Sequence, residues 1–142
     1  MARPIKCRKV EFLPETTKFI PYKNGKAKEI VLKVEELEAM RLKDIENLTQ
    51  QECADLMGIS RQTFQNIIDN ARKKVAIALT KGYGINIKGG NYAYNHCKLK
   101  CKSCNKTYEI QFVKDKEICP KCHSIKVVCK NRNENCKKLC TK

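Results

Sequence analysis

The stretch TQQECADLMGISRQTFQNIIDNARKKVAIAL, residues 49–79, decides the fold of the helical part of the chain. It opens with Thr49 and Glu52, which have the spacing of a capping box. In a capping box the threonine hydroxyl accepts the amide of residue 52, and the glutamate carboxylate accepts the amide of residue 49. The pattern therefore predicts a short helix that begins after Thr49 and ends at Met57.

A glycine and a serine separate this helix from a second one. Gly58 can adopt the left-handed conformation that commonly ends a helix, and Ser60 is a favourable N-cap. The apolar side chains that follow recur at helical spacing, which predicts an amphipathic helix from Ser60 to about Thr80. Its expected buried stripe consists of Phe64, Ile67, Ile68, Ala71, Val75, Ala78 and Leu79.

Two helices joined by a tight turn are typical of a helix-turn-helix. The helices must cross closely, so a small residue is needed at the crossing, and the turn favours glycine. Ala54 and Gly58 meet these requirements, and Phe64 and Ile67 follow as buried anchors. The alternative that shares this pattern is a small helical bundle with a solvated polar face.

The face of the second helix opposite the apolar stripe is polar, and it carries Arg61, Gln62, Gln65, Asn66 and Asp69. The first turn of such a helix usually enters the major groove of DNA. Arginine can bond guanine O6 and N7 together, and glutamine or asparagine can bond adenine N6 and N7. We therefore predict that Arg61, Gln62, Gln65 and Asn66 read bases.

Other polar residues of this helix are suited to the DNA backbone. Ser60, Thr63 and the amides of the first turn can donate to phosphate oxygens. Arg72, Lys73 and Lys74 lie farther along the helix, where we expect them to contact the backbone rather than the same groove.

A further helix is predicted before this unit, from Val34 to about Glu46, because apolar residues recur there at helical spacing. Glu35, Glu36 and Glu38 occupy its first turns, where the helix dipole favours negative charge.

The basic residues 1–32 are interrupted by three prolines. A turn signal at residues 23–26 separates two β-prone segments, 19–20 and 30–32, so this region is predicted to be a β-hairpin or a partly ordered basic arm. Glycines 82, 84, 89 and 90 are expected to delimit a short strand at residues 85–87 and a flexible joint.

The net charge is +15, from 30 Lys and Arg against 15 Asp and Glu. Counted by segment, residues 1–32 carry +5 and residues 96–142 carry +9, whereas residues 49–80 carry only +1. Such an excess favours a polyanionic partner, namely DNA, RNA or an anionic membrane surface. The longest apolar run, residues 75–79, is too short to cross a membrane, and the N-terminus lacks a signal-peptide pattern. We therefore expect a cytoplasmic protein without a membrane partner.

Residues 96–142 contain eight of the ten cysteines and form a separate module in our interpretation. Cys101, Cys104, Cys119 and Cys122 make two C-x-x-C knuckles that are 14 residues apart. Two knuckles on a hairpin complete a zinc tetrahedron, and a reducing compartment favours metal ligation over disulfides. The β-prone residues 107–113 between the knuckles predict a zinc ribbon with one structural Zn²⁺.

Other uses of the cysteines stay open. The four knuckle cysteines could form two redox disulfides. The spacing of Cys97, Cys101 and Cys104 matches an iron–sulfur motif of radical enzymes; the chain has no room for the barrel that those enzymes need, but a cluster of another kind is an alternative. A second metal site, or free thiols on a lysine-rich tail, would involve Cys129, Cys136 and Cys140 with His96 or Cys97, and His123 has no assigned role.

Two cysteines lie outside this module. Cys7 is expected to be a free thiol in the basic arm. Cys53 falls on the first helix of the predicted helix-turn-helix, and we expect it to be a small core residue.

The chain resembles an uncharacterised prokaryotic family of predicted DNA-binding proteins, whose helix-turn-helix is similar to the fourth region of sigma factors. The matching segments are MARP (1–4), EAMRLKD (38–44), LTQQECA (48–54), MGISRQTF (57–64), ARKK (71–74) and GGNY (89–92). The resemblance covers about residues 1–94. It implies DNA binding through the helix that Ser60 opens, no enzyme activity, and a cysteine module that members carry variably.

These observations predict a mainly α helix-turn-helix domain (three-helix, winged or arm-extended) at residues 33–95. A basic arm precedes it at residues 1–32, and a small β zinc ribbon with a basic tail follows at 96–142. The predicted function is sequence-specific binding of double-stranded DNA as a transcriptional regulator, without enzyme activity. The alternative is a protein- or RNA-interaction adaptor whose zinc ribbon docks on a partner such as RNA polymerase. The sequence leaves the oligomeric state open, and helix-turn-helix proteins often form dimers.

Overall fold

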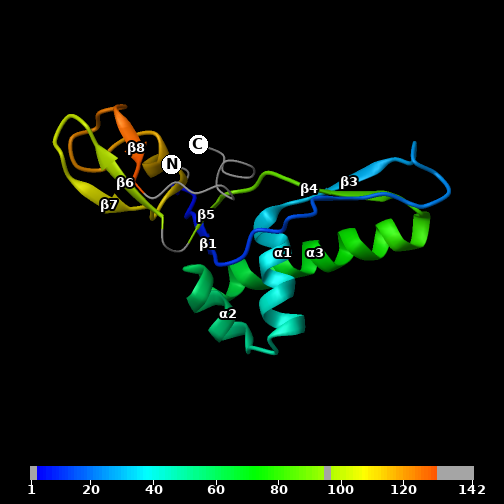
Figure 1. Ribbon diagram of the computed structural model, residues 1–142. Coiled ribbons are helices and arrows are strands. Elements are labelled where there is room, and N and C mark those ends of the chain that lie inside the picture. The colour runs from blue at the N-terminus through cyan, green and yellow to red at the C-terminus, as the bar shows by residue number, and fades with distance from the viewer. Residues whose placement is uncertain (1–2, 95–96, 131–142) are drawn as a thin grey trace.

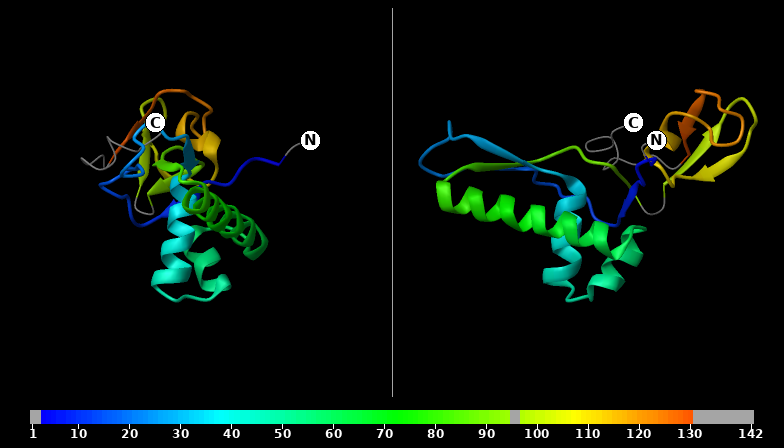
Figure 2. Two further views of the ribbon diagram at one scale, coloured as in Figure 1. Left: turned by 90° about the vertical axis from the view of Figure 1, so that its right-hand side faces the viewer. Right: turned by 180° about the vertical axis from the view of Figure 1, so that it is seen from behind.

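The computed structural model describes residues 3–94 and 97–130 of the 142-residue chain. Predictions that concern Met1, Ala2, His96, Cys136 and Cys140 lie outside the described residues. Within these residues, three helices form one unit and a narrow three-stranded sheet lies along the longest helix (Figure 1). A small β module that holds most of the described cysteines lies at the other end of the molecule from the tip of that sheet (Figures 1 and 2).

The predicted helices are confirmed to within a residue or two. α1 spans Val34–Met40 and continues into η1, Arg41–Ile45, where the helix widens to the π pattern. α2 spans Gln50–Met57 and α3 spans Arg61–Lys81.

Local capping fixes the ends of α2 and α3 as the sequence predicts. The Thr49 hydroxyl accepts the amide of Glu52 at 3.1 Å, and the Glu52 carboxylate accepts the amide of Thr49 at 3.1 Å. Gly58 ends α2 with a φ of 69°, and Ser60 Oγ accepts the amide of Thr63 at 3.1 Å. A cap of this kind contributes about 1 kcal/mol, so three successive local signals determine the turn between the helices.

The helical core is formed where the three helices meet. Ala54 and Phe64 are completely buried, and the small Ala54 side chain lets α2 approach its neighbours closely. The predicted apolar stripe of α3 is confirmed as far as Ala78, except that Val75 is only partly buried. The prediction is wrong for Leu79, which is 78% exposed. Beyond the helical core, α3 is covered only by the strands, so the side of the helix that is buried becomes narrower.

The narrow sheet has the order β2-β4-β3, with β2 at Lys18–Phe19, β3 at Glu29–Leu32 and β4 at Gly84–Ile87. The strands predicted near residues 19 and 30 are therefore present, but they do not pair as a hairpin. β4 lies between them, antiparallel to β2 and parallel to β3. Leu32 and Ile87 are opposite each other in the register and are both buried, which explains why β4 rather than β2 is the neighbour of β3.

The N-terminal segment is also part of the fold. β1, Arg8–Val10, pairs in parallel with β5, Tyr92–Tyr94. Val10 is completely buried and Leu13 is 7% exposed, both in a cluster with residues of α1, α3 and the sheet. The region predicted as a partly ordered basic arm therefore contributes apolar side chains to the core, and this burial holds it in place.

Three carboxylates that we expected to stabilise the helix dipole are buried, and each binds a cation. Their exposures are between 2% and 4%. The pairs are Glu35 with Arg8 at 2.9 Å, Glu36 with Lys74 at 2.7 Å and Glu38 with Arg41 at 2.6 Å. The Glu35 and Glu36 pairs connect α1 to the N-terminal segment and to α3, and the local sequence pattern does not indicate these two partners. The Glu38–Arg41 pair has the i,i+3 spacing of neighbours on one helix.

Of the two glycines predicted to form a flexible joint, Gly90 is closely packed, whereas Gly89 is exposed and has open space around it. The Asn91 amide donates to Glu35 Oε1 at 2.7 Å. A Cβ atom on Gly90, whose φ is 114°, would lie 2.7 Å from the same carboxylate oxygen. The chain therefore needs glycine here so that its backbone can approach the buried carboxylate.

The cysteine module is a three-stranded antiparallel sheet with a short helical turn. Its order is β7-β6-β8, with β6 at Lys98–Cys101, β7 at Thr107–Glu109, β8 at Val127–Cys129 and the turn η2 at Val113–Lys116. The β-prone character predicted for residues 107–113 is confirmed for 107–109 by β7, whereas η2 already begins at Val113.

The N-terminal segment joins this module to the helical unit. Just before β1, the Cys7 amide donates to the Gln111 carbonyl at 2.9 Å, and the Val113 amide donates to the Ile5 carbonyl at 2.9 Å. The Cys7 side chain is 3% exposed and packs in the core of the module beside Leu99. Residues 5–7 therefore bind the cysteine module, and residues 8–10 pair with β5.

Candidate nucleic-acid interface and metal centre

The polar face of α3 begins directly after the turn at Gly58. Arg61, Gln62 and Asn66 are exposed, and Gln65 is partly buried. Beneath them, Phe64, Ile67 and Ile68 fix the helix on the core. The residues that the sequence predicts to read bases therefore share one accessible face on a rigid support.

Hydrogen bonds order the side chains of this face. Gln50, at the start of α2, accepts Arg61 Nε at 3.2 Å and donates to Gln65 Oε1. Gln65 donates to Asp69 Oδ1 at 2.7 Å, and along the neighbouring row Gln62 donates to Asn66 at 3.1 Å. Gln50 was not among the predicted site residues. The sequence places Gln50 directly after the N-cap residue Thr49, but its approach to α3 depends on how the two helices cross.

The side chains predicted to contact the DNA backbone differ in whether they are already bound within the protein. Ser60 and Thr63 bond to each other at the N-cap, Oγ to Oγ1 at 2.9 Å. Arg72 donates to Asp44 at 2.5 Å, and Asp44 raises the pKa of this guanidinium, through a hydrogen bond above all. Lys74 is bound by Glu36. Lys73 is exposed and has no ion pair with another described residue.

Four cysteine thiols converge at the end of the cysteine module. The Sγ atoms of Cys101, Cys104, Cys119 and Cys122 all lie within 4.8 Å of one another. The separations are 3.5 Å for Cys101–Cys122 and 3.9 Å for Cys104–Cys119. A tetrahedral ion with bonds of about 2.3 Å to sulfur would place its ligands about 3.8 Å apart. The predicted grouping is therefore confirmed, and the four cysteines are able to hold one metal ion.

The two knuckles have the same backbone geometry. Each is followed by a left-handed residue, Asn105 with a φ of 60° and His123 with a φ of 62°. The amides of these residues donate to the carbonyls of Cys101 and Cys119, in both cases at 2.9 Å. His123 therefore helps the chain to turn back after the second knuckle, and it is not in the group of metal-binding side chains.

Backbone amides prepare two of the thiols for deprotonation. The Cys104 amide, which donates to Cys101, lowers the pKa of Cys101 to about 6. The Cys122 amide lowers the pKa of Cys119 in the same way. Because thiolates are the form that binds metals, these amides favour the state that a cation requires at Cys101 and Cys119.

The remaining described cysteines are outside this group. Cys53 is completely buried in the helical core, as predicted. Cys7 is a free thiol, but burial in the cysteine module raises its pKa to about 11. Cys97 and Cys129 are partly buried and do not belong to the group of four thiols. Within residues 3–94 and 97–130, the cysteine tetrad (Cys101, Cys104, Cys119 and Cys122) is the only set of three or more side chains placed to bind a metal ion together. The other ligands of the suggested second site lie outside the described residues.

No helix in the described part of the chain is long and apolar enough to cross a membrane. The fold and the thiol group define a small basic protein in which a three-helix unit is joined to a β module with a four-cysteine site. The chain belongs to the family described as "Protein of unknown function DUF134", which matches residues 1–95. This match ends just before the cysteine module.

Similar proteins match nearly the whole chain. A UPF0251 protein of Clostridium novyi (strain NT) is 57% identical over 144 residues, which cover 100% of this chain and 98% of the relative. A UPF0251 protein of Clostridium botulinum (strain 657 / Type Ba4) is 58% identical over 142 residues, covering 99% of this chain and 90% of the relative. No solved structure matches the chain.

Proposed function

We propose that this protein is a non-enzymatic, sequence-specific DNA-binding protein that acts as a transcriptional regulator. In this proposal α2, the turn at Gly58 and α3 are a helix-turn-helix, and α3 enters the major groove. The observation that carries the proposal is the ordered polar face of α3, which begins directly after a tight turn and rests on a buried core.

The dimensions of α3 suit this role. A helix of 21 residues is about 31 Å long, and the major groove is about 12 Å wide, enough to admit a helix. Arg61 and Gln62 lie in the first turn, which is the part of a recognition helix that contacts base edges. Arg72 lies about 16 Å farther along the axis, where a straight helix leaves the curved groove, so a contact with the backbone is more favourable there.

The hydrogen bonds of the free protein support a division of roles. Arg61 would bond the O6 and N7 atoms of a guanine, while Gln62 and Asn66 suit adenine. Gln50 would orient Arg61 and Gln65 from α2, so that less side-chain freedom is lost on binding. The +1 charge of residues 49–80 is too small to supply most of the affinity for DNA, which must come from the basic flanks.

The cysteine tetrad is proposed to be a structural zinc site in a zinc ribbon. Its four thiols would leave no ligand position open, and their separations suit zinc–sulfur bonds. A bound ion would hold together the two loops that carry the knuckles. Elemental analysis of the purified protein should find one zinc per chain; iron with the absorbance of an iron–sulfur cluster would contradict the assignment.

In vitro selection from random duplex DNA tests the main proposal. We expect a defined motif to be enriched, and Arg61→Ala to lose about 1–3 kcal/mol on that motif while tolerating other bases at one position. Lys81→Ala, at the exposed far end of the same helix, is the control and should bind like the wild type.

If Arg61→Ala bound the selected motif as tightly as the wild type, α3 would not be the recognition helix. If no motif were enriched, the protein would not be a sequence-specific DNA-binding protein. That outcome would favour the alternative of an adaptor that binds another protein or RNA through the cysteine module.

A further inference from the structure

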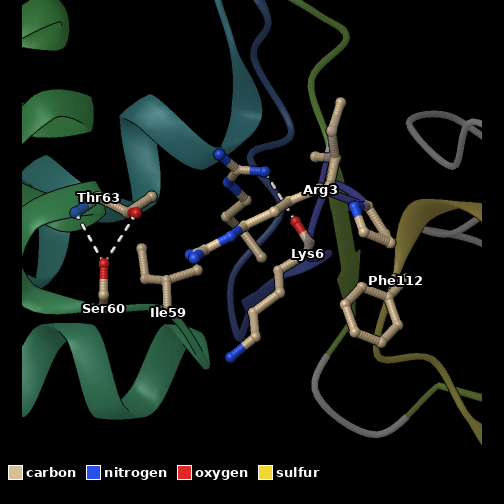
Figure 3. A pocket seen from close by; sticks show the side chains of 9 residues that line it. Arg3, Lys6, Ile59, Ser60, Thr63 and Phe112 are labelled. Carbon is tan, nitrogen blue, oxygen red and sulfur yellow. Dashed lines mark hydrogen bonds between the residues drawn. The ribbon is translucent and has the colours of Figure 1, made fainter. Parts of the chain in front are cut away.

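A cleft of about 470 Å³ lies where the N-terminal segment, the start of α3 and the cysteine module meet (Figure 3). Side chains from all three parts of the molecule line it, among them Arg3, Lys6, Ile59, Ser60, Thr63 and Phe112. The two modules therefore share one concave surface, although they are far apart in the sequence.

All the charged side chains that line the cleft are cations, namely Arg3, Lys6 and Arg8. Arg8 has structural partners: its Nε contacts Glu35 at 2.9 Å and its Nη1 donates to the Lys6 carbonyl at 2.7 Å. Arg3 and Lys6 are exposed and form no ion pair with any residue that the structure describes. Two positive charges are thus available to a ligand, and Arg8 fixes the backbone that carries one of them.

The cysteine module forms the wall of the cleft opposite α3. Lys6 and Phe112 form an antiparallel bridge, flanked by the hydrogen bonds from Cys7 to Gln111 and from Val113 to Ile5. Lys114 Nζ lies 5.9 Å from the centre of the Phe112 ring and adds another exposed cation near this wall. The module therefore positions positive charge beside the helical unit.

The cleft lies next to the residues that are proposed to read bases. Ser60 and Thr63 line the cleft, and Arg61 and Gln62 lie between them in the sequence. Sites for small molecules are mostly apolar and bury most of their ligand. Here the free cations are exposed, as expected of a surface that follows a polyanion.

We propose that this cleft binds phosphates of the DNA backbone beside the base pairs that α3 reads, with Arg3 and Lys6 as the phosphate ligands. The inference rests on the function proposed above and deepens it. It gives the N-terminal segment and the cysteine module a direct part in holding DNA, and it assigns non-specific affinity to residues separate from the recognition face.

The test compares two double variants with the same change in charge. Arg3→Gln/Lys6→Gln removes the free cations of the cleft. Lys23→Gln/Lys26→Gln removes two exposed cations from the turn between β2 and β3, at the far tip of the sheet (Figure 1). Binding of the full-length proteins to the selected duplex and to a scrambled duplex is measured over a series of salt concentrations. Circular dichroism of each variant is used to check that it is folded.

Each phosphate contact contributes about 0.9 to the slope of log affinity against log salt. The cleft variant should therefore lose about 1–2 from the slope, and about 10- to 60-fold in affinity near 0.1 M salt. It should lose this affinity on both duplexes alike, so that the preference for the selected motif is unchanged. The tip variant should keep nearly the slope of the wild type.

Two further measurements determine which DNA phosphates contact the cleft, and whether the cleft binds the phosphates of DNA or free phosphate. Ethylation of individual phosphates should weaken binding of the wild type at positions that flank the motif, and the cleft variant should no longer respond at those positions. Inorganic phosphate should compete with DNA no better than chloride at equal ionic strength. Stronger competition by phosphate that disappears in the cleft variant would identify a site for free phosphate and overturn the proposal.

The outcomes separate the two proposals. If the wild type selects a motif but the cleft and tip variants have equal slopes, the cleft does not bind the backbone, while the proposed function stands. If the cleft variant loses preference for the motif, its residues read bases and the division of roles is wrong. If the wild type binds no duplex, both proposals fail.

Discussion

Glu35→Gln tests whether a buried ion pair holds the N-terminal segment in place. Glu35 is 3% exposed, contacts Arg8 at 2.9 Å and accepts the Asn91 amide at 2.7 Å. Breaking a buried pair typically costs about 3–5 kcal/mol, because an unpaired charge is left behind. Glutamine keeps an acceptor for Asn91, and the Arg8 side chain is 16% exposed. We therefore expect a loss of about 2–3 kcal/mol in the free energy of unfolding, at or below the lower end of that range because the Arg8 side chain keeps some contact with water.

The Arg72–Asp44 pair is the natural control. Its 2.5 Å contact is shorter, but its side chains are 48% and 46% exposed. Exposed pairs contribute about 0–1 kcal/mol, because water and salt screen them. Asp44→Asn should therefore cost less than 1 kcal/mol.

Urea unfolding followed by far-UV circular dichroism compares the two variants. With a slope of about 1–3 kcal/mol/M, Glu35→Gln should lower the urea midpoint by about 1–2 M, and Asp44→Asn should shift it much less. Equal shifts would refute the reasoning that burial, rather than distance, decides the strength of these pairs.

Three further predictions concern the turn and the cysteines. Gly58→Ala should lose about 1–2 kcal/mol of stability, because φ is 69° there; Gly25→Ala, with no atom within 4 Å of the added Cβ, should be nearly neutral by the same urea assay. Cys122→Ser should bind less than one zinc per chain by elemental analysis, whereas Cys129→Ser should keep the wild-type content; equal zinc in both would remove Cys122 from the site. Cys7, whose pKa is raised to about 11 by burial, should resist iodoacetamide in the native protein near neutral pH, where it is protonated, and should react upon unfolding. Mass spectrometry measures this labelling, and rapid native labelling of Cys7 would show that the N-terminal segment opens readily.

Features with local causes could be predicted from the sequence. The ends of α2 and α3 depend on Thr49, Gly58 and Ser60, each of which acts within four residues of itself. The knuckles also depend on local spacing, and the structure brings all four cysteines together. A periodic apolar pattern with good caps therefore defined the helices, although it overestimated the buried stripe at Leu79.

Strand pairing and buried charges could not be predicted in this way. Glu29 lies opposite Gly84 in the sheet, and Arg8 lies opposite Tyr92, so the partners are far apart in the sequence. Strands of two to four residues have little periodicity of their own. In the sequence, Glu35 and Gln50 fit the first turns of their helices, and only the tertiary contacts reveal that they bind Arg8 and Arg61.

The pairing of β1 also constrains how the protein is made. During synthesis, residues 5–10 leave the ribosome well before Tyr92 and Gln111, on which their hydrogen bonds depend. The helices can fold early because their contacts are local, but the N-terminal segment must wait until most of the chain has been translated. Val10 and Leu13, which are buried in the complete fold, therefore lack part of their packing partners, including Tyr92, during this interval. The pairings of residues 5–10 therefore require that residues 91–94 and 111–113 have already been made, and the cationic cleft, which Phe112 lines, can be complete only after that point.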